Sequence, residues 1–269
     1  MINTPTPLDE LFKRTKSENR AALIAYIPAG FPTKSDCHRV IQAFVDGGVD
    51  AIEIGFPYSD PVMDGPTIQA AAVTALNNGT GAEDVLDALE VASKAGVPSV
   101  VMTYWNPIEK YGVEKFAAAI KSHGGSGVIH PDITIEESSQ WLNAAQSHAI
   151  NPIYVVAPST SNDRLQKVTS QAGGFVYAAS IMGVTGARTT VSSGAEDLVA
   201  RVRTVSQLPV AVGLGVSTRE QAKDVARYAD GVIVGSAFVK AILDAPTIDA
   251  GLAAVTALAR ELALGVRGQ

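Results

Sequence analysis

A single carboxylate interrupts one of the most apolar stretches of the chain. Glu53 stands within AIEIGFP, residues 51–57, which otherwise has no polar side chain. An ionised carboxylate without a partner is costly in an apolar interior, so its pKa rises and it stays protonated part of the time near neutral pH. Such a group can both give and take a proton. The alternative is a structural role, in which a buried Arg, Lys or backbone donor satisfies Glu53.

Two aspartates follow in the segment that leaves this apolar stretch. Asp60 and Asp64 lie within YSDPVMDGP, residues 58–66. Asp-Pro and Asp-Gly are turn dipeptides, so turn chemistry alone is the alternative for either residue. A strand carboxylate and a carboxylate of the following loop nevertheless converge on one cavity, where two different environments can divide acid and base roles. Glu53 with a loop aspartate is therefore a candidate acid–base pair.

Three glycine-containing turns occur near the carboxyl end of the last three predicted strands. They read GVTG at 183–186, GLGVS at 213–217 and GSA at 235–237, and the last leads into a helix. Glycine lets main-chain N–H groups approach an anion, and a helix amino terminus adds a partial positive charge. Barrels recurrently bind phosphate at the loops after strands seven and eight. We predict a phosphate site here, although tight turning explains any one of these motifs taken alone.

Large side chains also recur near the ends of other predicted strands. These residues are Tyr26, Met102, Tyr104, Ile129 and Tyr177. They are candidates to line an apolar pocket at the carboxyl ends of these strands, and ordinary core packing is the alternative. Trp105 and Trp141 are assigned to packing.

The elements that must position these residues are eight short, β-branched apolar runs. The runs cover residues 22–30, 50–57, 99–105, 127–132, 152–158, 174–180, 209–215 and 231–237. Each run is nearly continuous rather than alternating, which is typical of parallel strands covered on both faces. Strands alternate with helix-period segments and no linker interrupts them, so we predict one (β/α)8 barrel domain over residues 1–269. An open doubly wound sheet is the competing fold.

Helices are predicted between and around these runs, with two unusually long connections. The predicted helices include 35–45, 67–77, 82–95, 136–148, 195–205 and 219–228, with extra helices at 8–15 and 250–264 that close the barrel floor and pad its outside. The stretches 58–98 and 181–208 are longer than a barrel requires. Excess length after a strand lies on the catalytic face of a barrel and is more often functional than decorative.

Composition excludes several function classes. The chain has 269 residues and 21 basic against 27 acidic side chains, a net charge of −6 with no basic surplus for nucleic acid or anionic lipid. Cys37 is the only cysteine, so no internal disulfide forms, and no targeting segment or membrane span is visible; the cytoplasm is the expected compartment. The histidines show no metal-ligand spacing, and His123, His130 and His148 are interpreted as loop or helix-surface residues.

The motifs together resemble a known family. The segment EIGFPYSDPVMDGPTIQ, residues 53–69, resembles the signature of the tryptophan synthase alpha chain family, and the glycine turns fall where that family holds phosphate. The resemblance runs from about residue 11 to residue 264. It implies a lyase that cleaves indole-3-glycerol phosphate to indole and glyceraldehyde 3-phosphate in a retro-aldol step. Glu53 matches the family's acid–base glutamate, and Asp64 matches its aspartate beside the indole nitrogen.

The resemblance also implies roles for other residues. The implied phosphate-binding residues are Gly186, Gly215, Gly235 and Ser236. The implied indole-pocket residues are Tyr26, Tyr104, Ile129, Tyr177 and Leu214. Thr185 is similar to a lid residue that orients Asp64, and residues 183–193 would form the mobile lid.

Members of the family work with a PLP-dependent beta chain, usually as an α2β2 heterotetramer that passes indole between sites. Residues 57–61, including Asp60, match positions near that contact. The resemblance therefore implies a beta-chain partner that carries the PLP, with no cofactor and no metal in this chain.

Two other functions compete with this interpretation. One is another phosphate-binding barrel of the same pathway, such as indole-3-glycerol-phosphate synthase or phosphoribosylanthranilate isomerase. The synthase normally uses a strand lysine, and none of the eight predicted strands contains one. The other is a non-catalytic role as an allosteric partner of the beta chain, against which Glu53 and Asp64 argue.

Overall fold

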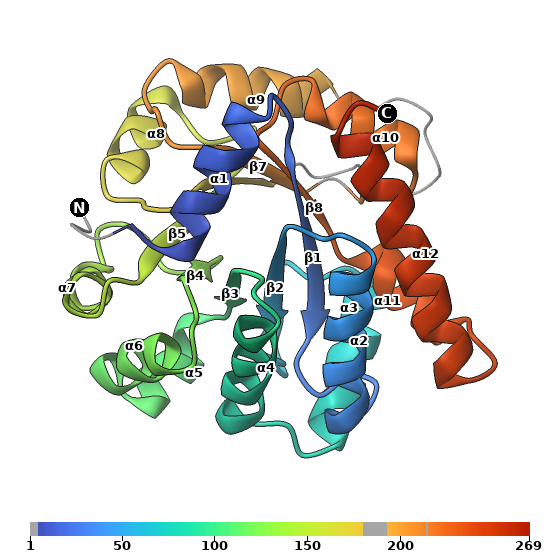
Figure 1. The fold of residues 1–269 in the computed structure, drawn as a ribbon. Coiled ribbons are helices and arrows are strands. Elements are labelled where there is room, and N and C mark those ends of the chain that lie inside the picture. The colour runs from blue at the N-terminus through green and yellow to red at the C-terminus, as the bar shows by residue number, and fades with distance from the viewer. Residues whose placement is uncertain (1–4, 180–192, 214) are drawn as a thin grey trace.

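The chain folds into a closed parallel barrel (Figure 1). The computed structural model describes residues 5–179, 193–213 and 215–269. Its strands are β1 (Ala22–Pro28), β2 (Ala51–Gly55), β3 (Ser99–Met102), β4 (Gly127–His130), β5 (Asn151–Val156), β6 (Val176–Ala179), β7 (Val210–Gly213) and β8 (Gly231–Val234). They pair in chain order, and β8 closes on β1. The predicted (β/α)8 barrel is confirmed, and the open sheet is ruled out.

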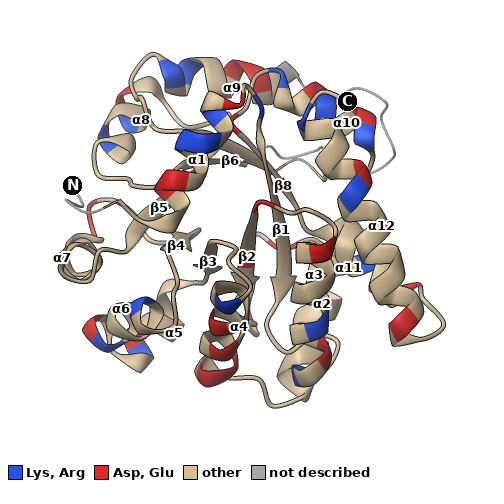
Figure 2. Ribbon diagram, in the orientation of Figure 1, with Lys and Arg blue, Asp and Glu red and all other residues tan. Residues whose placement is uncertain are grey.

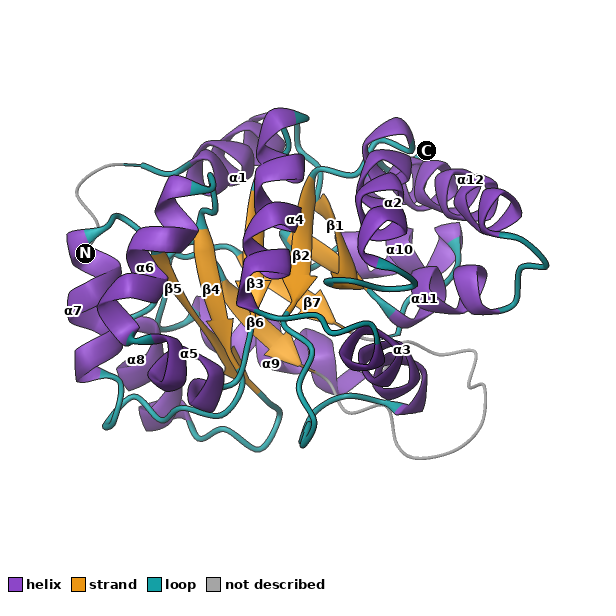
Figure 3. Cartoon of the chain, turned by 90° about the horizontal axis from the view of Figure 1, so that it is seen from below, coloured by secondary structure: helices purple, strands orange, loops and turns teal. Residues whose placement is uncertain are grey.

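Helices surround the strands, as Figure 3 shows. They are α1 (Pro7–Ser17), α2 (Lys34–Asp46), α3 (Pro66–Asn77), α4 (Ala82–Lys94), α5 (Trp105–Tyr111), α6 (Val113–Ser122), α7 (Ser139–Ser147), α8 (Asn162–Thr169), α9 (Ser193–Arg203), α10 (Arg219–Ala226), α11 (Ser236–Leu243) and α12 (Ile248–Val266). This arrangement buries both faces of the strands, which explains their continuous apolar sequences. In β1, Leu23 packs in the cluster shared with the helices, whereas Ile24 belongs to the barrel interior.

The amino-terminal helix closes the floor of the barrel. Helix α1 starts with a capping box formed by Thr6 and Asp9. In this box the Thr6 N–H donates to the Asp9 carboxylate over 2.7 Å. Leu8, Leu11 and Phe12 then join the interior cluster. At the other end of the chain, α12 packs outside the barrel against α2, α10 and α11. Both predicted terminal helices are therefore confirmed in place and in role.

The third strand is shorter than predicted. The sequence predicts a strand up to residue 105, whereas β3 ends at Met102 and Trp105 begins α5. The reason is a contact distant in sequence: the Trp105 N–H donates to both carboxylate oxygens of Asp132, at 3.0 Å each. A carboxylate at this position stabilises the first turn of a helix.

The assignment of His130 to a loop or helix surface is wrong. His130 is the last residue of β4 and is buried, with its ring centroid 4.8 Å from that of Trp141 in an edge-to-face contact. Burial lowers the pKa of its imidazole to about 3, so the ring is neutral. The apolar face of the strand continues through this residue. His123 and His148 follow the last turns of α6 and α7 and stay partly exposed, as expected.

Acidic and basic residues lie mainly on the helices, and the strands are mostly tan in Figure 2, the colour of all other residues. Across β1–β8, Glu53 is the only residue that is Asp, Glu, Lys or Arg. The helices present in the described part of the chain include none with the length and apolarity to cross a membrane. Within the same residues, no group of three His, Cys, Asp or Glu side chains is placed to hold a metal ion.

Candidate active site

A cavity of about 350 Å³ lies at the carboxyl ends of the strands. Its walls come from β1, β2, β3, β6, β7 and β8, from the loop after β2, and from the starts of α3 and α11. The lining residues are Tyr26, Glu53, Met63, Asp64, Gly65, Ile68, Met102, Tyr177, Ala179, Gly213, Gly215, Ile233, Gly235 and Ser236. Glu53 and Asp64, two of the three carboxylates singled out in the sequence, therefore face one cavity.

Glu53 lines this cavity and is 1% exposed. Its Oε2 atom has no hydrogen-bond partner in the described structure, so the alternative of a satisfied structural glutamate is not supported. Burial, reinforced by the negative charge of Asp64, raises the pKa of the Glu53 carboxyl to about 8. A carboxyl of this kind is protonated at neutral pH and available as an acid.

Asp50, which directly precedes β2, is also buried but is fully paired. Its carboxylate accepts hydrogen bonds from two nitrogens of Arg20, at 2.8 and 2.9 Å, and from the Leu23 N–H at 2.9 Å. The fold therefore provides partners for a buried carboxylate at the floor of the barrel. Glu53 instead faces the cavity, and its Oε2 has no such partner among the described residues, which is the environment expected of a catalytic group.

Asp64 enters the cavity from the loop between β2 and α3. Burial raises the pKa of its carboxyl, and the Gln69 side chain donates to its backbone oxygen over 2.8 Å. Asp60 is exposed and does not line the cavity. The structure thus distinguishes the two loop aspartates, which the turn motifs alone left open.

Two tyrosines flank Glu53. Tyr26 of β1 is paired in register with Glu53, and Tyr177 reaches the cavity from β6. Each hydroxyl lies where a neighbouring glycine leaves room: a Cβ on Gly55 would lie 2.3 Å from Tyr26 Oη, and one on Gly213 would lie 2.6 Å from Tyr177 Oη. Burial, together with the nearby carboxylates, raises the pKa of both phenols well above the ordinary value.

Between the strands that carry these two tyrosines, the wall of the cavity is rich in glycine and ends at a helix. Gly235 precedes α11, and no side chain caps the free N–H groups of its first turn. Gly215 adopts φ +68°, a left-handed conformation that glycine tolerates, and has open space around it. Gly215, Gly235 and Ser236 all line the cavity. Uncapped N–H groups at a helix start attract anions.

Two other predicted site residues lie outside the cavity lining. Tyr104 and Ile129 are buried but do not line the cavity; Tyr104 precedes α5, and Ile129 packs in the barrel interior. Thr185, Gly186 and Leu214 are outside the described residues, as is nearly all of the predicted lid.

Sequence reasoning missed part of the cavity wall. The residues concerned are Met63, Gly65, Ile68, Ala179 and Ile233. Met63 and Gly65 flank Asp64, which was a usable signal. Ile68 and Ile233 lie in apolar segments where nothing local separates a cavity wall from ordinary core.

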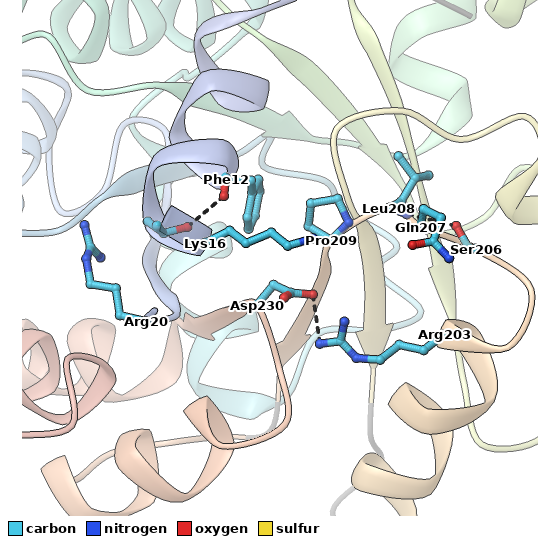
Figure 4. A pocket seen from close by; sticks show the side chains of 10 residues that line it. Phe12, Lys16, Arg20, Arg203, Ser206, Gln207, Leu208, Pro209 and Asp230 are labelled. Carbon is cyan, nitrogen blue, oxygen red and sulfur yellow. Dashed lines mark hydrogen bonds and ion pairs between the residues drawn. The ribbon is translucent and has the colours of Figure 1, made fainter. Parts of the chain in front are cut away.

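A smaller cavity of about 150 Å³ lies at the amino-terminal ends of the strands (Figure 4). Lys16, Arg20 and Arg203 line it, but both arginines are already paired, with Asp50 and Asp230 respectively. Because active sites of barrels form at the carboxyl ends of strands, this cavity is not the candidate site.

Known proteins resemble this chain over nearly its whole length. The family model for the tryptophan synthase alpha chain matches residues 12–267. The tryptophan synthase alpha chain of Streptomyces coelicolor is 53% identical over 263 residues, which cover 97% of each protein. That of Mycobacterium marinum is 52% identical over 260 residues, covering 97% of this chain and 94% of the relative.

Solved structures agree with this assignment. The structure of Mycobacterium tuberculosis tryptophan synthase in space group F222 matches with a TM-score of 0.91 and 48% identity, over 98% of this chain and 99% of that one. The tryptophan synthase subunit alpha of Legionella pneumophila matches with a TM-score of 0.89 and 31% identity, over 98% and 99%. On fold, cavity and sequence together, the chain belongs to the tryptophan synthase alpha chain family.

Proposed function

We propose that this chain is the lyase subunit that cleaves indole-3-glycerol phosphate to indole and glyceraldehyde 3-phosphate. The observation that carries the proposal is Glu53, a buried carboxyl without a partner in the described structure, whose pKa is raised to about 8 in a cavity shared with Asp64. The family relationship supports the same reaction.

Glu53 supplies and recovers one proton in this mechanism. The protonated carboxyl donates to indole C3, which makes the ring a cationic electron acceptor. The resulting carboxylate then removes the proton of the hydroxyl on the adjacent glycerol carbon. As the aldehyde forms, the bond from C3 to that carbon breaks and its electron pair restores the indole ring. Protons balance, and general acid–base help of this kind contributes about 10²–10⁴-fold.

Asp64 carries the negative charge of the pair. Positive charge develops on the indole N1–H when C3 is protonated, and a carboxylate beside N1 stabilises it. The two roles are compatible because the charge of Asp64 itself helps to keep Glu53 protonated. The retro-aldol step assigned to these residues needs neither an electron-sink cofactor nor a metal, so we propose that the chain works without either.

The substrate phosphate is proposed to bind at the glycine-rich wall. Gly215, Gly235 and Ser236 line the cavity beside the uncapped start of α11, where backbone N–H groups supply the positive end of a dipole. Gly186 is assigned to the same group by family resemblance alone. A chain of net charge −6 can hold an anion in this way without a lysine.

The indole ring is proposed to bind beside the two tyrosines. Tyr26 and Tyr177 line the cavity there. Tyr104, Ile129 and Leu214 remain predictions of pocket residues from the family resemblance, and Thr185 remains a predicted lid residue that orients Asp64.

A beta chain that carries PLP is the proposed partner, in an α2β2 assembly. The loop that carries Asp64 presents two large apolar side chains to solvent: Val62 is 76% exposed and Met63 is 39% exposed. Exposed apolar residues beside a cavity suit a protein partner that receives its product.

The decisive experiment is an indole-release assay on indole-3-glycerol phosphate, with and without a cognate beta chain. Indole formation that the beta chain accelerates supports both proposals. Indole formation unaffected by the beta chain would reject the partner, and no indole in either condition would reject the lyase.

A further inference from the structure

The hydroxyl of Tyr104 holds the backbone of the loop that carries Asp64. Its oxygen accepts hydrogen bonds from two successive amides, the N–H of Val62 at 3.0 Å and the N–H of Met63 at 3.2 Å. Tyr104 is buried, whereas the Val62 side chain is mostly exposed. The loop is therefore attached to the protein body through its main chain at the residues that directly precede Asp64.

Contacts with other parts of the protein hold Tyr104 itself in place. It directly precedes α5, whose first amide, on Trp105, is held by Asp132 from the loop after β4. The Tyr104 ring also packs against that of Tyr58, with centroids 5.0 Å apart, and the Asn106 side chain donates to the Tyr58 hydroxyl over 3.1 Å. The Tyr104 hydroxyl, which accepts the loop amides, therefore belongs to a residue at the start of a helix that other contacts hold in place.

Among the residues that the structure describes, none donates a hydrogen bond to the carboxylate of Asp64. Its backbone oxygen accepts one from the Gln69 side chain, and burial raises the pKa of the carboxyl. Its location in the cavity therefore depends on where the main chain of residues 62–65 lies.

We propose that Tyr104 is a positioning residue, whose hydroxyl places Asp64 in the cavity by accepting the Val62 and Met63 amides. This inference rests on the proposed function and refines it, since the ring of Tyr104 does not line the cavity. A displacement of a charged group by about 1 Å can cost up to about 100-fold in rate, so two lost hydrogen bonds in this loop have a measurable effect.

Tyr104→Phe tests the proposal because it keeps the ring and removes the acceptor. We expect kcat for indole release to fall about 10-fold while KM changes less than about 2-fold, because Asp64 acts on charge that develops in the transition state. In an Asp64→Asn background the same substitution should cause no further loss, since its effect passes through Asp64. Tyr111→Phe is the matched control: that hydroxyl, at the other end of α5, donates to Glu83 over 3.4 Å, and kcat should not change.

Hydrogen exchange gives a readout independent of activity. The Val62 and Met63 amides should exchange about 10-fold faster in Tyr104→Phe than in the wild type, and no faster in Tyr111→Phe. The melting temperature of each variant checks that its chain is folded. Unchanged exchange at these amides, or an equal loss of kcat with and without Asp64, would overturn the positioning role. A wild-type chain that releases no indole would instead count against the proposed function, and the exchange result would still decide the loop contact.

Discussion

Asp50, directly before β2, and Glu53, within β2, are two buried carboxylates with opposite surroundings. Asp50 lies at the barrel floor and is paired with Arg20, whereas Glu53 faces the catalytic-end cavity and its Oε2 is unpartnered among the described residues. One carboxylate is paired within the fold, and the other has a raised pKa and is the proposed proton donor. Substitutions at the two positions should therefore separate stability from activity.

Glu53→Gln should abolish indole formation, with a loss of at least about 10²-fold, because the amide cannot donate and recover the proton. The fold should persist, and binding of a glycerol phosphate, measured by calorimetry, should be retained. Full activity in this variant would refute the acid–base role of Glu53.

The pH dependence of stability should also respond to Glu53. Its pKa is about 8 in the folded chain against an ordinary value of 4.5, so between these values the folded state binds a proton that the unfolded state has lost. The contribution of this group to the free energy of unfolding is therefore fully present below pH 4.5. It declines by roughly 3–5 kcal/mol as the pH rises to 8. The free energy of unfolding, measured with urea at pH 5, 6.5 and 8, should decline less with pH in Glu53→Gln than in the wild type. Equal slopes for the two proteins would show that Glu53 has an ordinary pKa.

Asp64→Asn should slow the reaction and move its pH profile. Removing the negative charge lowers the pKa of Glu53, so the alkaline limb of kcat/KM, expected near pH 8 in the wild type, should shift to lower pH. Asp60→Asn, an exposed carboxylate of the same loop, is the control and should leave the limb in place. A limb that does not move in Asp64→Asn would mean that the two carboxylates do not interact.

Asp50→Ala should destabilise the chain by about 1–3 kcal/mol, because it removes the buried acceptor of the Leu23 N–H and leaves the partly buried Arg20 paired with Glu18 alone. Asp60→Ala, at an exposed position, should change the free energy of unfolding by less than about 0.5 kcal/mol. Under conditions where Asp50→Ala is folded, its rate of indole release should remain near that of the wild type. A small loss of stability would show that the buried pair contributes little.

Gly213→Ala should be costly because its Cβ would lie 2.6 Å from the Tyr177 hydroxyl. We expect a loss of roughly 1–3 kcal/mol in the free energy of unfolding, partly restored when Tyr177→Phe is added. Gly194→Ala in α9 is the matched control, since nothing lies within 4 Å of the added Cβ, and should be neutral or stabilising. Additive effects of Gly213→Ala and Tyr177→Phe in a double-mutant cycle would contradict the clash.

Much of the fold could be predicted because its signals are local. Each strand is a short apolar run, and its alternation with helical segments is enough to indicate a barrel. For the site, Glu53 was detectable because a carboxylate in an apolar run is costly wherever the strand lies. The glycines at 213, 215 and 235 were also visible in the sequence, and Gly215 adopts a φ of +68° that glycine tolerates.

Several features depended instead on contacts between distant segments. Asp132 ends β3 early by holding the Trp105 amide, His130 is buried because aromatic neighbours cover it, and Tyr104 binds the Val62 amide 42 residues away. No periodicity within one segment encodes such partners, because they meet only after the barrel has closed. The sequence by itself determined the barrel and the candidate proton-transfer residue; the tertiary structure decided which loop carboxylate joins it and what holds that loop in place.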